Sequence, residues 1–565
     1  MRILRHTTRA APTLAAADRM DDPNDILIPL LPPFLALLGQ AADAQARGEH
    51  AAHDLWLAAA AHLHATDADA LTQLTGALVA RQRTADAIAL AECAVRVQPG
   101  AAAYFNHGYA LQMAGRHADA VAPYRAALAL DADRPSLRNN LAIALRLSGS
   151  PRAEEIALLD AAVDADPSDV QAWTNLVVAR IATQDLDGAL ACAARLVELA
   201  PDNALAMNNA AMAMKEAQRW DDAERYAARA CELAPDDASF RFNLAIIQLV
   251  RGNYAAGWRG HEARWDGAGE LRGRRPVLPG PRWQGEPLAG KTLLVWGEQG
   301  LGDVLQFCRF VEPLAERVHR EGGRLVWNTF PAVGALMQRS LGAHADVFGA
   351  GGGVDVLPAF DYEVPLIGLP LMLGMEMSTL ASSVPYLRAD PEARDAWRAR
   401  LAGDRRLKVG LVWTGSVGHQ RNPFRRVGLE RYADAFRGLD GVAFHSLQPG
   451  AHADVAEARA AGFAIEDFTA ELTSFDDTAA YIGALDLVIT VCTSVAHLAG
   501  ALGARTWVLL DVNPHWPWLL ERKDSPWYPT ATLYRQPTFG AWEPVMAGVS
   551  RDLRSLLAGH AQPRG

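Results

Sequence analysis

The sequence predicts an α-helical solenoid followed by two α/β halves, and two observations support this prediction. The first half of the chain repeats itself with a period of 34 residues, which is typical of stacked helical hairpins. The period is marked by Pro99, Pro167, Pro201 and Pro235, and Asp133 occupies the one position of the series that has no proline. After about residue 290 the pattern changes to apolar β-type runs that alternate with helical stretches, which indicates parallel sheets.

Composition limits the class of protein. The 565 residues are enough for several domains, and 50% hydrophobic with 21% charged residues is ordinary for a globular chain. The formal net charge is −11, and no long Lys/Arg run or basic domain is present. We therefore expect neither a nucleic-acid partner nor an anionic membrane surface, and any anionic ligand must be bound by local basic residues.

The cysteines and the amino terminus indicate a cytoplasmic protein. The five cysteines are dispersed and form no CxxC pair, so neither a disulfide framework nor a zinc site is expected. Residues 1–25 contain Arg2, Arg5 and Arg9 but no apolar stretch of signal-peptide length, and we interpret them as a flexible tail. The apolar segment near residue 30 contains two adjacent prolines, so no membrane insertion is expected.

The repeats share a second feature, a small residue two places after a recurring asparagine, as in Asn106-His107-Gly108 and Asn140-Leu141-Ala142. With the 34-residue period and an alanine-rich second helix, they resemble tetratricopeptide repeats (TPRs). Weaker copies extend back to about residue 35, which gives six or seven units within an array of residues 26–265. The segment at 253–265, NYAAGWRGHEARW, is expected to cap the last repeat.

The recurring asparagines form a candidate acceptor-binding ladder on the first helix of each repeat, which in such arrays lines the concave groove. The ladder consists of Asn106, Asn140, Asn175, Asn209 and Asn243. An asparagine side chain offers one acceptor and two donors, so it can match the backbone of an extended polypeptide. The alternative is that these amides bond within or between repeats.

A linker at 266–290, rich in Gly, Pro and Arg, precedes the α/β region. Strands are expected at LLVW (293), LVW (325), KVGLVW (408), AFHSL (443), DLVITV (486), TWVLL (506) and TLY (532). A charged helix at 391–406 joins two Rossmann-like halves, 291–390 and 391–550, and a helix or tail follows at 551–565. Two such halves enclose a cleft.

One acid lies at the corner of the first half. Residues 293–309, LLVWGEQGLGDVLQFCR, predict a buried strand, a glycine turn and a helix whose start carries Asp303. Ligands of open α/β sheets bind beyond the carboxyl ends of the strands, so Asp303 can face a substrate cleft. The alternative is that Asp303 only caps the helix.

Two stretches of the second half have the chemistry of a phosphate site. The loop 414–426 follows a buried strand and contains Thr414, Gly415, Ser416, His419, Arg421, Arg425 and Arg426, which suits a diphosphate unless the loop is merely a solvated basic surface. The stretch 475–503 carries Asp477 and Thr478 at a helix start, then a strand ending in Cys492, Thr493 and Ser494, with His497 one turn later. A structural role is the alternative for His497.

The motifs GDVLQ, VGLVWTGS, SLQPG, DTAA and TVCTSVAHLAGALG, placed after a TPR array, resemble TPR-containing glycosyltransferases that are similar to lipopolysaccharide heptosyltransferases. That group includes flagellin glycosyltransferases and is organised like the O-GlcNAc transferases. The resemblance implies a GT-B fold and a general base at Asp303, next to Gly302 of the GDVL motif. It also implies a donor-phosphate loop with Thr493, Ser494 and His497, and a donor-side Gln448 in SLQPG.

The chain departs from that family at two places. Cys492 stands where the family usually has Asp before Thr-Ser, and a thiol supplies no anion at neutral pH if its pKa stays near 8.5. Asn422-Pro423-Phe424 replaces the more usual Asn-Asp-Arg, so fewer residues there match a phosphate site.

The resulting hypothesis is a cytoplasmic, metal-independent protein O-glycosyltransferase. Its TPR groove holds a polypeptide, flagellin being favoured, and its GT-B cleft holds a nucleotide sugar as co-substrate, with no further cofactor. Two alternatives stay open: a glycolipid or polysaccharide transferase, which needs no peptide groove, and a non-catalytic scaffold, which Cys492 suggests. The sugar, the nucleotide, the acceptor residue, the anomeric outcome and the oligomeric state do not follow from the sequence.

Overall fold

The computed structural model describes residues 31–62, 68–97, 99–298, 300–352, 356–375, 377, 380, 384–416 and 421–560. The expected flexible tail at 1–25 and the candidate ligand His419 lie outside these residues. The chain divides after Ala217 into two compact units, which are described separately below. No helix of the described residues is long and apolar enough to cross a membrane.

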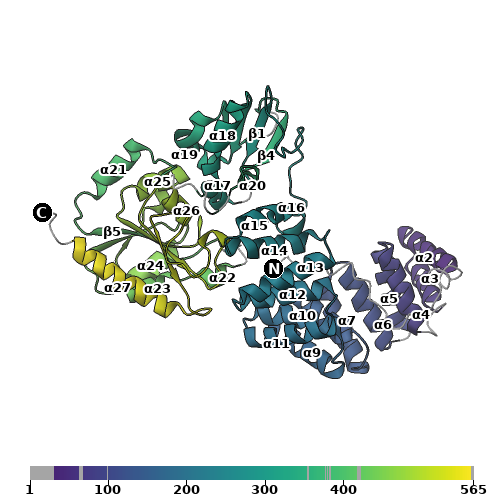
Figure 1. The fold of residues 1–565 in the computed structure, drawn as a ribbon. Coiled ribbons are helices and arrows are strands. Elements are labelled where there is room, and N and C mark those ends of the chain that lie inside the picture. The colour runs from purple at the N-terminus through teal and green to yellow at the C-terminus, as the bar shows by residue number, and fades with distance from the viewer. Residues whose placement is uncertain are drawn as a thin grey trace. The chain divides into compact units, whose positions relative to one another are not determined.

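The first unit is an all-helical array (Figure 1). Its helices are α2 (Leu31–Ala46), α3 (His50–His62), α4 (Ala68–Ala80), α5 (Thr84–Val97), α6 (Ala101–Met113), α7 (His117–Leu130), α8 (Leu137–Ser148), α9 (Arg152–Ala165), α10 (Val170–Ala182), α11 (Leu186–Leu199) and α12 (Ala204–Glu216). They pair in chain order as the repeat period predicts.

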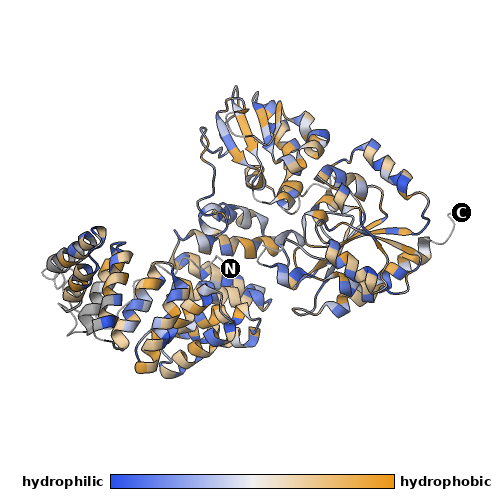
Figure 2. Cartoon of the chain, turned by 180° about the vertical axis from the view of Figure 1, so that it is seen from behind, coloured by the Kyte–Doolittle hydropathy of each residue, from blue (hydrophilic) through white to orange (hydrophobic). Residues whose placement is uncertain are grey.

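Small residues allow these helices to pack closely. Ala110, Ala142 and Ala179 are fully buried, and Figure 2 shows apolar and polar residues interspersed along the helices of the array that carry a hydropathy colour. At Gly108 in α6, a β-carbon would lie 2.6 Å from the ring of Tyr124 in α7, so only glycine fits. In this repeat, the small residue two places after the asparagine is therefore required for the contact between the two helices.

The second unit begins with four more helices: α13 (Trp220–Leu233), α14 (Ala238–Val250), α15 (Tyr254–His261) and α16 (Arg264–Gly267). Side-chain caps begin two of them. Asp237 accepts hydrogen bonds from the backbone N–H groups of Ser239 and Phe240, and Asn253 accepts one from Ala256. These helices precede two parallel sheets in the same unit.

The first sheet has the order β3-β2-β1-β4, and all its pairings are parallel. Its strands are β1 (Thr292–Trp296), β2 (Arg324–Thr329), β3 (Val347–Ala350) and β4 (Tyr362–Pro365). The accompanying helices are α17 (Leu301–Phe307), η2 (Cys308–Phe310), α18 (Val311–Arg320), α19 (Pro331–Leu341), η3 (Gly342–His344), η5 (Leu366–Gly368) and α20 (Leu369–Met372).

The second sheet has the order β10-β9-β8-β5-β6-β7 and is also parallel throughout. Its strands are β5 (Leu407–Val412), β6 (Val442–Ser446), β7 (Ile465–Glu466), β8 (Leu487–Val491), β9 (Thr506–Leu510) and β10 (Ala531–Arg535). Its helices are α21 (Pro391–Leu401), α22 (Asn422–Arg425), α23 (Leu429–Ala435), α24 (His452–Ala460), η7 (Thr469–Glu471), α25 (Phe475–Ile482), α26 (Ser494–Ala501), η8 (Trp516–Trp518) and α27 (Trp542–His560).

The predicted fold class, a helical solenoid followed by two Rossmann-like α/β halves, is confirmed. Each of the seven expected strands is present, and the structure adds the short strands β3, β4 and β7. The expected linker is built into the first half: Trp283 is fully buried, and Arg275 forms an ion pair with Glu363 of β4 at 2.9 Å.

The aromatic residues of the closing segment 253–265 pack on the α/β region as well as on α14. The rings of Trp258 and Trp516 lie 5.1 Å apart and nearly perpendicular, and Trp258 also contacts Phe307 of α17. The Tyr254 hydroxyl accepts a hydrogen bond from Nε1 of Trp527 at 2.7 Å. The segment thus joins the last repeat to the sheets within one core.

Candidate functional site

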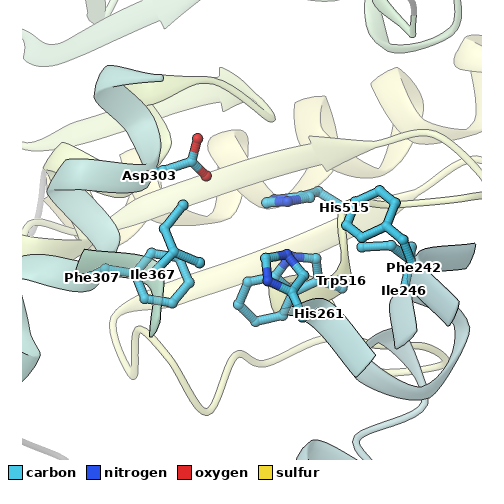
Figure 3. Close-up of a pocket in the computed structure, with 8 residues that line it drawn as sticks. All are labelled: Phe242, Ile246, His261, Asp303, Phe307, Ile367, His515 and Trp516. Carbon is cyan, nitrogen blue, oxygen red and sulfur yellow. The ribbon is translucent and has the colours of Figure 1, made fainter. Parts of the chain in front are cut away.

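Asp303 lies in the first turn of α17, just beyond the carboxyl end of β1. Its carboxylate oxygen Oδ2 accepts a hydrogen bond from the backbone N–H of Gly300 at 3.1 Å. The side chain is half-buried and faces a cavity (Figure 3). Asp303 therefore both caps its helix and presents a carboxylate to a cleft, so the two sequence interpretations are compatible.

The cavity has a volume of about 100 Å³, small beside the roughly 300–1,000 Å³ of sites that enclose a drug-sized ligand. It is lined by Phe242 and Ile246 of α14, His261 of α15, Asp303 and Phe307 of α17, Ile367 of η5, His515, and Trp516 of η8 (Figure 3). Five of the eight lining residues are apolar, and Asp303, His261 and His515 add polar groups to the wall. The space suits a small side chain or one arm of a sugar rather than a whole nucleotide sugar.

The electrostatic environment makes Asp303 a usable base. Burial raises the pKa of its carboxyl to about 6, the hydrogen bond from Gly300 opposes this rise, and the charge of Glu298 adds to it. A carboxylate with a pKa near 6 is ionised at neutral pH and accepts a proton more readily than an ordinary aspartate.

Glu298 belongs to a buried ion network that the sequence did not reveal. Its carboxylate binds the fully buried Arg264 of α16 through two hydrogen bonds, at 2.7 and 3.0 Å, and accepts the backbone N–H of Ile367 at 3.1 Å. Arg264 also bonds Glu262 at 2.8 Å, and Glu262 pairs with Arg282. The network fixes the turn between β1 and Asp303 to the closing segment.

The start of α17 lies next to the start of α26 in the second half. A β-carbon at Gly302 would lie in van der Waals contact with Ser494 and His497, at 3.5 Å, so the two helix starts approach closely. Thr493 is the N-cap of α26, and Ser494 is its first residue. The structure thus brings the predicted base and the predicted phosphate loop together.

The loop after β5 is held by side-chain hydrogen bonds to its backbone. The N–H of Thr414 donates to Oε1 of Gln448 at 3.3 Å, and the N–H of Gly415 donates to Oδ1 of Asn422 at 2.8 Å. Ser416 is exposed. Asn422 lies in the stretch that departs from the family, and its side chain holds the backbone of this loop at Gly415.

The arginines of this loop differ in their surroundings. Arg425 donates to the carbonyl of Cys492 at 2.8 Å, so it ties the loop to the end of β8, next to β5. Arg421 pairs with Asp511 at 3.2 Å. Arg426 is exposed at the end of α22. Arg425 therefore stabilises the loop through its hydrogen bond, whereas the charge of Arg426 is exposed to solvent.

His497 is buried, and Nδ1 of its ring lies 2.9 Å from the hydroxyl of Tyr528. The ring stacks on Trp518, and burial together with the charge of Arg309 lowers the pKa of the imidazole to about 3. His497 is therefore neutral near pH 7 and supports α26 from within the core. These contacts correspond to the structural alternative for this residue.

Cys492 accepts a hydrogen bond from Nε1 of Trp518 at 3.2 Å. Burial raises the pKa of the thiol, so the side chain is uncharged at neutral pH. No anion stands at this position, where the resembling family has an aspartate.

Asp477 and Thr478 begin α25 and are engaged in its capping. The carboxylate of Asp477 accepts the N–H and hydroxyl groups of Thr473 and Ser474, which lowers its pKa despite an opposing effect of burial. The hydroxyl of Thr478 donates to the carbonyl of Ser474 at 3.0 Å. This geometry is that of a helix cap.

The asparagines of the array bond mainly between repeats. Asn106 donates to Thr72 at 3.2 Å, Asn175 to Oδ1 of Asn139 at 2.8 Å, and Asn209 to the carbonyl of Thr174 at 3.4 Å. These three are at most 4% exposed, which matches the alternative of bonds between repeats. The remaining two members of the ladder, Asn140 and Asn243, are half-buried, and acceptor binding there stays a proposal.

The structure adds residues to the site that sequence reasoning missed. Phe242, Ile246 and His261 belong to the last repeat and the closing segment, and His515 belongs to the loop after β9. In the sequence, the first three looked like packing residues of a helical array. The available signal was the histidine in HEARW, which lies between the aromatic residues Trp258 and Trp265 of the closing segment.

Comparisons with known proteins identify the repeats. A family model described as tetratricopeptide repeat matches residues 76–135, 143–204 and 208–265. Protein FlbA of Caulobacter vibrioides is 29% identical over 478 residues, which are 80% of this chain and 72% of that protein.

Two solved structures superpose on parts of this chain. A family 9 glycosyl transferase from Veillonella parvula superposes with a TM-score of 0.38 and 11% identity, over 49% of this chain and 100% of the other. The pilF protein of Pseudomonas aeruginosa superposes with a TM-score of 0.32 and 17% identity, over 35% of this chain and 90% of the other.

Proposed function

We propose that the protein is a glycosyltransferase that moves a sugar from a nucleotide sugar to a Ser or Thr hydroxyl of a polypeptide. The observation that carries the proposal is the position of Asp303, a carboxylate with a pKa of about 6 in a cavity at the carboxyl end of a parallel sheet. The start of a second helix, α26, lies beside it. This arrangement supports a base for the acceptor next to a phosphate site for the donor.

In the proposed reaction, the carboxylate of Asp303 takes the proton of the acceptor hydroxyl as its oxygen attacks the anomeric carbon. The bond between that carbon and the donor's diphosphate breaks, and the electron pair leaves with the nucleoside diphosphate. A positioned base of this kind typically contributes about 10²- to 10⁴-fold to the rate.

The leaving diphosphate needs positive charge. Thr493 and Ser494 at the start of α26 offer backbone N–H groups, and the exposed Arg426 offers a cation. We propose that these groups, with Thr414 and Ser416, replace a metal ion in this role. The peptide groove of the TPR array and the choice of flagellin as acceptor rest on the resemblance described above.

Mass spectrometry tests the proposal. Flagellin from cells with the wild-type protein should be heavier, by the mass of whole sugars, than flagellin from cells that lack it. Asp303→Asn should abolish most of the difference, because asparagine still caps the helix but does not accept the proton. Asp237→Asn is a matched control, since Asp237 also caps a helix of this unit but lies outside the cavity.

A non-catalytic scaffold is the second candidate, and the uncharged thiol of Cys492 favours it. Calorimetric titration with UDP-, GDP- and CMP-sugars separates the two. A folded protein that binds none of them and leaves flagellin unmodified would be a scaffold.

A further inference from the structure

The cavity beside Asp303 is built from three parts of the chain. Asp303, Phe307 and Ile367 come from the first α/β half, His515 and Trp516 from the second, and Phe242, Ile246 and His261 from the last repeat and the closing segment (Figure 3). The repeat region therefore contributes a wall of the catalytic cavity itself.

His261 is the polar part of that wall. The residue is 6% exposed, and its Nδ1 atom is buried with no hydrogen-bond partner among the described residues. A buried polar atom left unpaired costs free energy, and His261 lines the cavity, so its unpaired ring nitrogen is a candidate partner for a ligand group. Burial and the neighbouring Arg264 and His515 hold the pKa of His261 well below its usual value, so the ring is neutral.

We propose that this cavity is the acceptor subsite, and that His261 binds the hydroxyl-bearing residue of the polypeptide that Asp303 deprotonates. The inference rests on the proposed function and adds that the last repeat selects the residue to be modified.

The chemistry of the cavity defines its occupant. A hydroxyl both donates and accepts, so it can pair with Nδ1 of a neutral imidazole in either tautomer. Phe242, Ile246 and Phe307 offer apolar contact to the β-carbon and methyl group of the residue. A carboxylate side chain would face the charge of Asp303 within the same small space, so Asp and Glu are excluded.

A binding experiment without sugar transfer tests the inference. Fluorescence anisotropy measures the affinity of degenerate nonapeptides with a central Thr or a central Val. The two residues have nearly the same shape, but valine has a methyl group where threonine has its hydroxyl. The wild-type protein should prefer the Thr pool by about 10-fold or more, because valine leaves the buried polar groups unpaired. His261→Leu should reduce this preference by about 3- to 10-fold.

His445→Asn is the control, since His445 is also buried in this unit and bonds Tyr481 at 2.9 Å, away from the cavity. It should keep the wild-type preference. Ile246→Trp is a second variant at a half-buried position, where the larger ring fills the cavity and should weaken the Thr pool at least 10-fold. Melting temperature and nucleotide affinity monitor the fold of each variant.

An equal Thr preference in wild type and His261→Leu would overturn the inference, as would undiminished binding by a folded Ile246→Trp. The proposed function fails separately. If no sugar is transferred but His261 still governs the Thr preference, the subsite stands and the transferase does not. If sugar is transferred and the Thr preference is the same in wild type and His261→Leu, the proposed acceptor subsite is wrong but the proposed function stands.

Discussion

Arg264 and Glu298 form a two-point ion pair in the core, at 2.7 and 3.0 Å, and both side chains are fully buried. The pair joins the closing segment of the repeat region to the turn that carries Asp303. Desolvation offsets much of the Coulomb attraction of such a pair, so its main consequence is geometric. It fixes the position of Asp303 relative to the wall formed by α14 and α15.

Removing one partner of this pair should be strongly destabilising. Glu298→Gln removes one of the two carboxylates that pair with the buried Arg264, the other being Glu262, and we expect the free energy of unfolding of the second unit to fall by about 3 kcal/mol. Denaturant unfolding measures this change. The exposed pair of Arg437 and Asp434 is the comparison, and Arg437→Ala should cost at most about 1 kcal/mol. Equal effects of the two variants would contradict the assignment.

Asn175 should be required for the stability of the array. Its amide donates to Asn139 and accepts from Arg146, both buried, so Asn175→Ala leaves two buried groups short of a partner. We expect a loss of about 1–3 kcal/mol in thermal or denaturant unfolding. Asn140→Ala, at a half-buried position, should change stability less and instead weaken acceptor binding if the groove uses this amide. A silent Asn175→Ala would argue against the bonds between repeats.

The fold could be predicted further than the site. β1, β5 and β8 are continuous apolar runs and were predicted, whereas β7 has only two residues and β4 contains Glu363 and Pro365, so their patterns carry little signal. Asp303 was found because the glycine turn marks it. His261 and Glu298 were not, because their roles arise from contacts between segments more than 30 residues apart, which periodicity does not report.

The two adjacent arginines of the basic loop should behave differently. Arg426 is exposed, so Arg426→Ala should weaken nucleotide-sugar binding by roughly 1.5–3 kcal/mol if its guanidinium reaches the diphosphate, with no change in melting temperature. Arg425 holds the carbonyl of Cys492, so Arg425→Ala should lower both the affinity and the melting temperature. Calorimetry and thermal unfolding measure the two effects. Wild-type nucleotide-sugar affinity in both variants would indicate that the loop is a solvated basic surface and does not bind the diphosphate.

The acid limb of the pH profile should belong to Asp303. Because burial raises its pKa to about 6, kcat/KM for sugar transfer should be level above that pH and fall about tenfold per unit well below it, as the base becomes protonated. Asp303→Asn should transfer sugar at least about 100-fold more slowly and lose this limb. An unchanged limb in the variant would assign it to another group.

The same shift predicts a change in stability with a definite sign. The pKa of Asp303 rises from 3.8 to about 6 on folding, so between these values the folded protein binds the proton more tightly than the unfolded chain. The contribution of Asp303 to the free energy of unfolding therefore decreases as the pH rises through this window. Asn does not titrate, so Asp303→Asn should be more stable relative to wild type at pH 7 than at pH 4.

Unfolding at both pH values measures the difference, and other titrating groups cancel because both proteins share them. If the variant instead loses stability relative to wild type between pH 4 and pH 7, the carboxylate is stabilised by folding, and Asp303 is a helix cap without the raised pKa that a base requires.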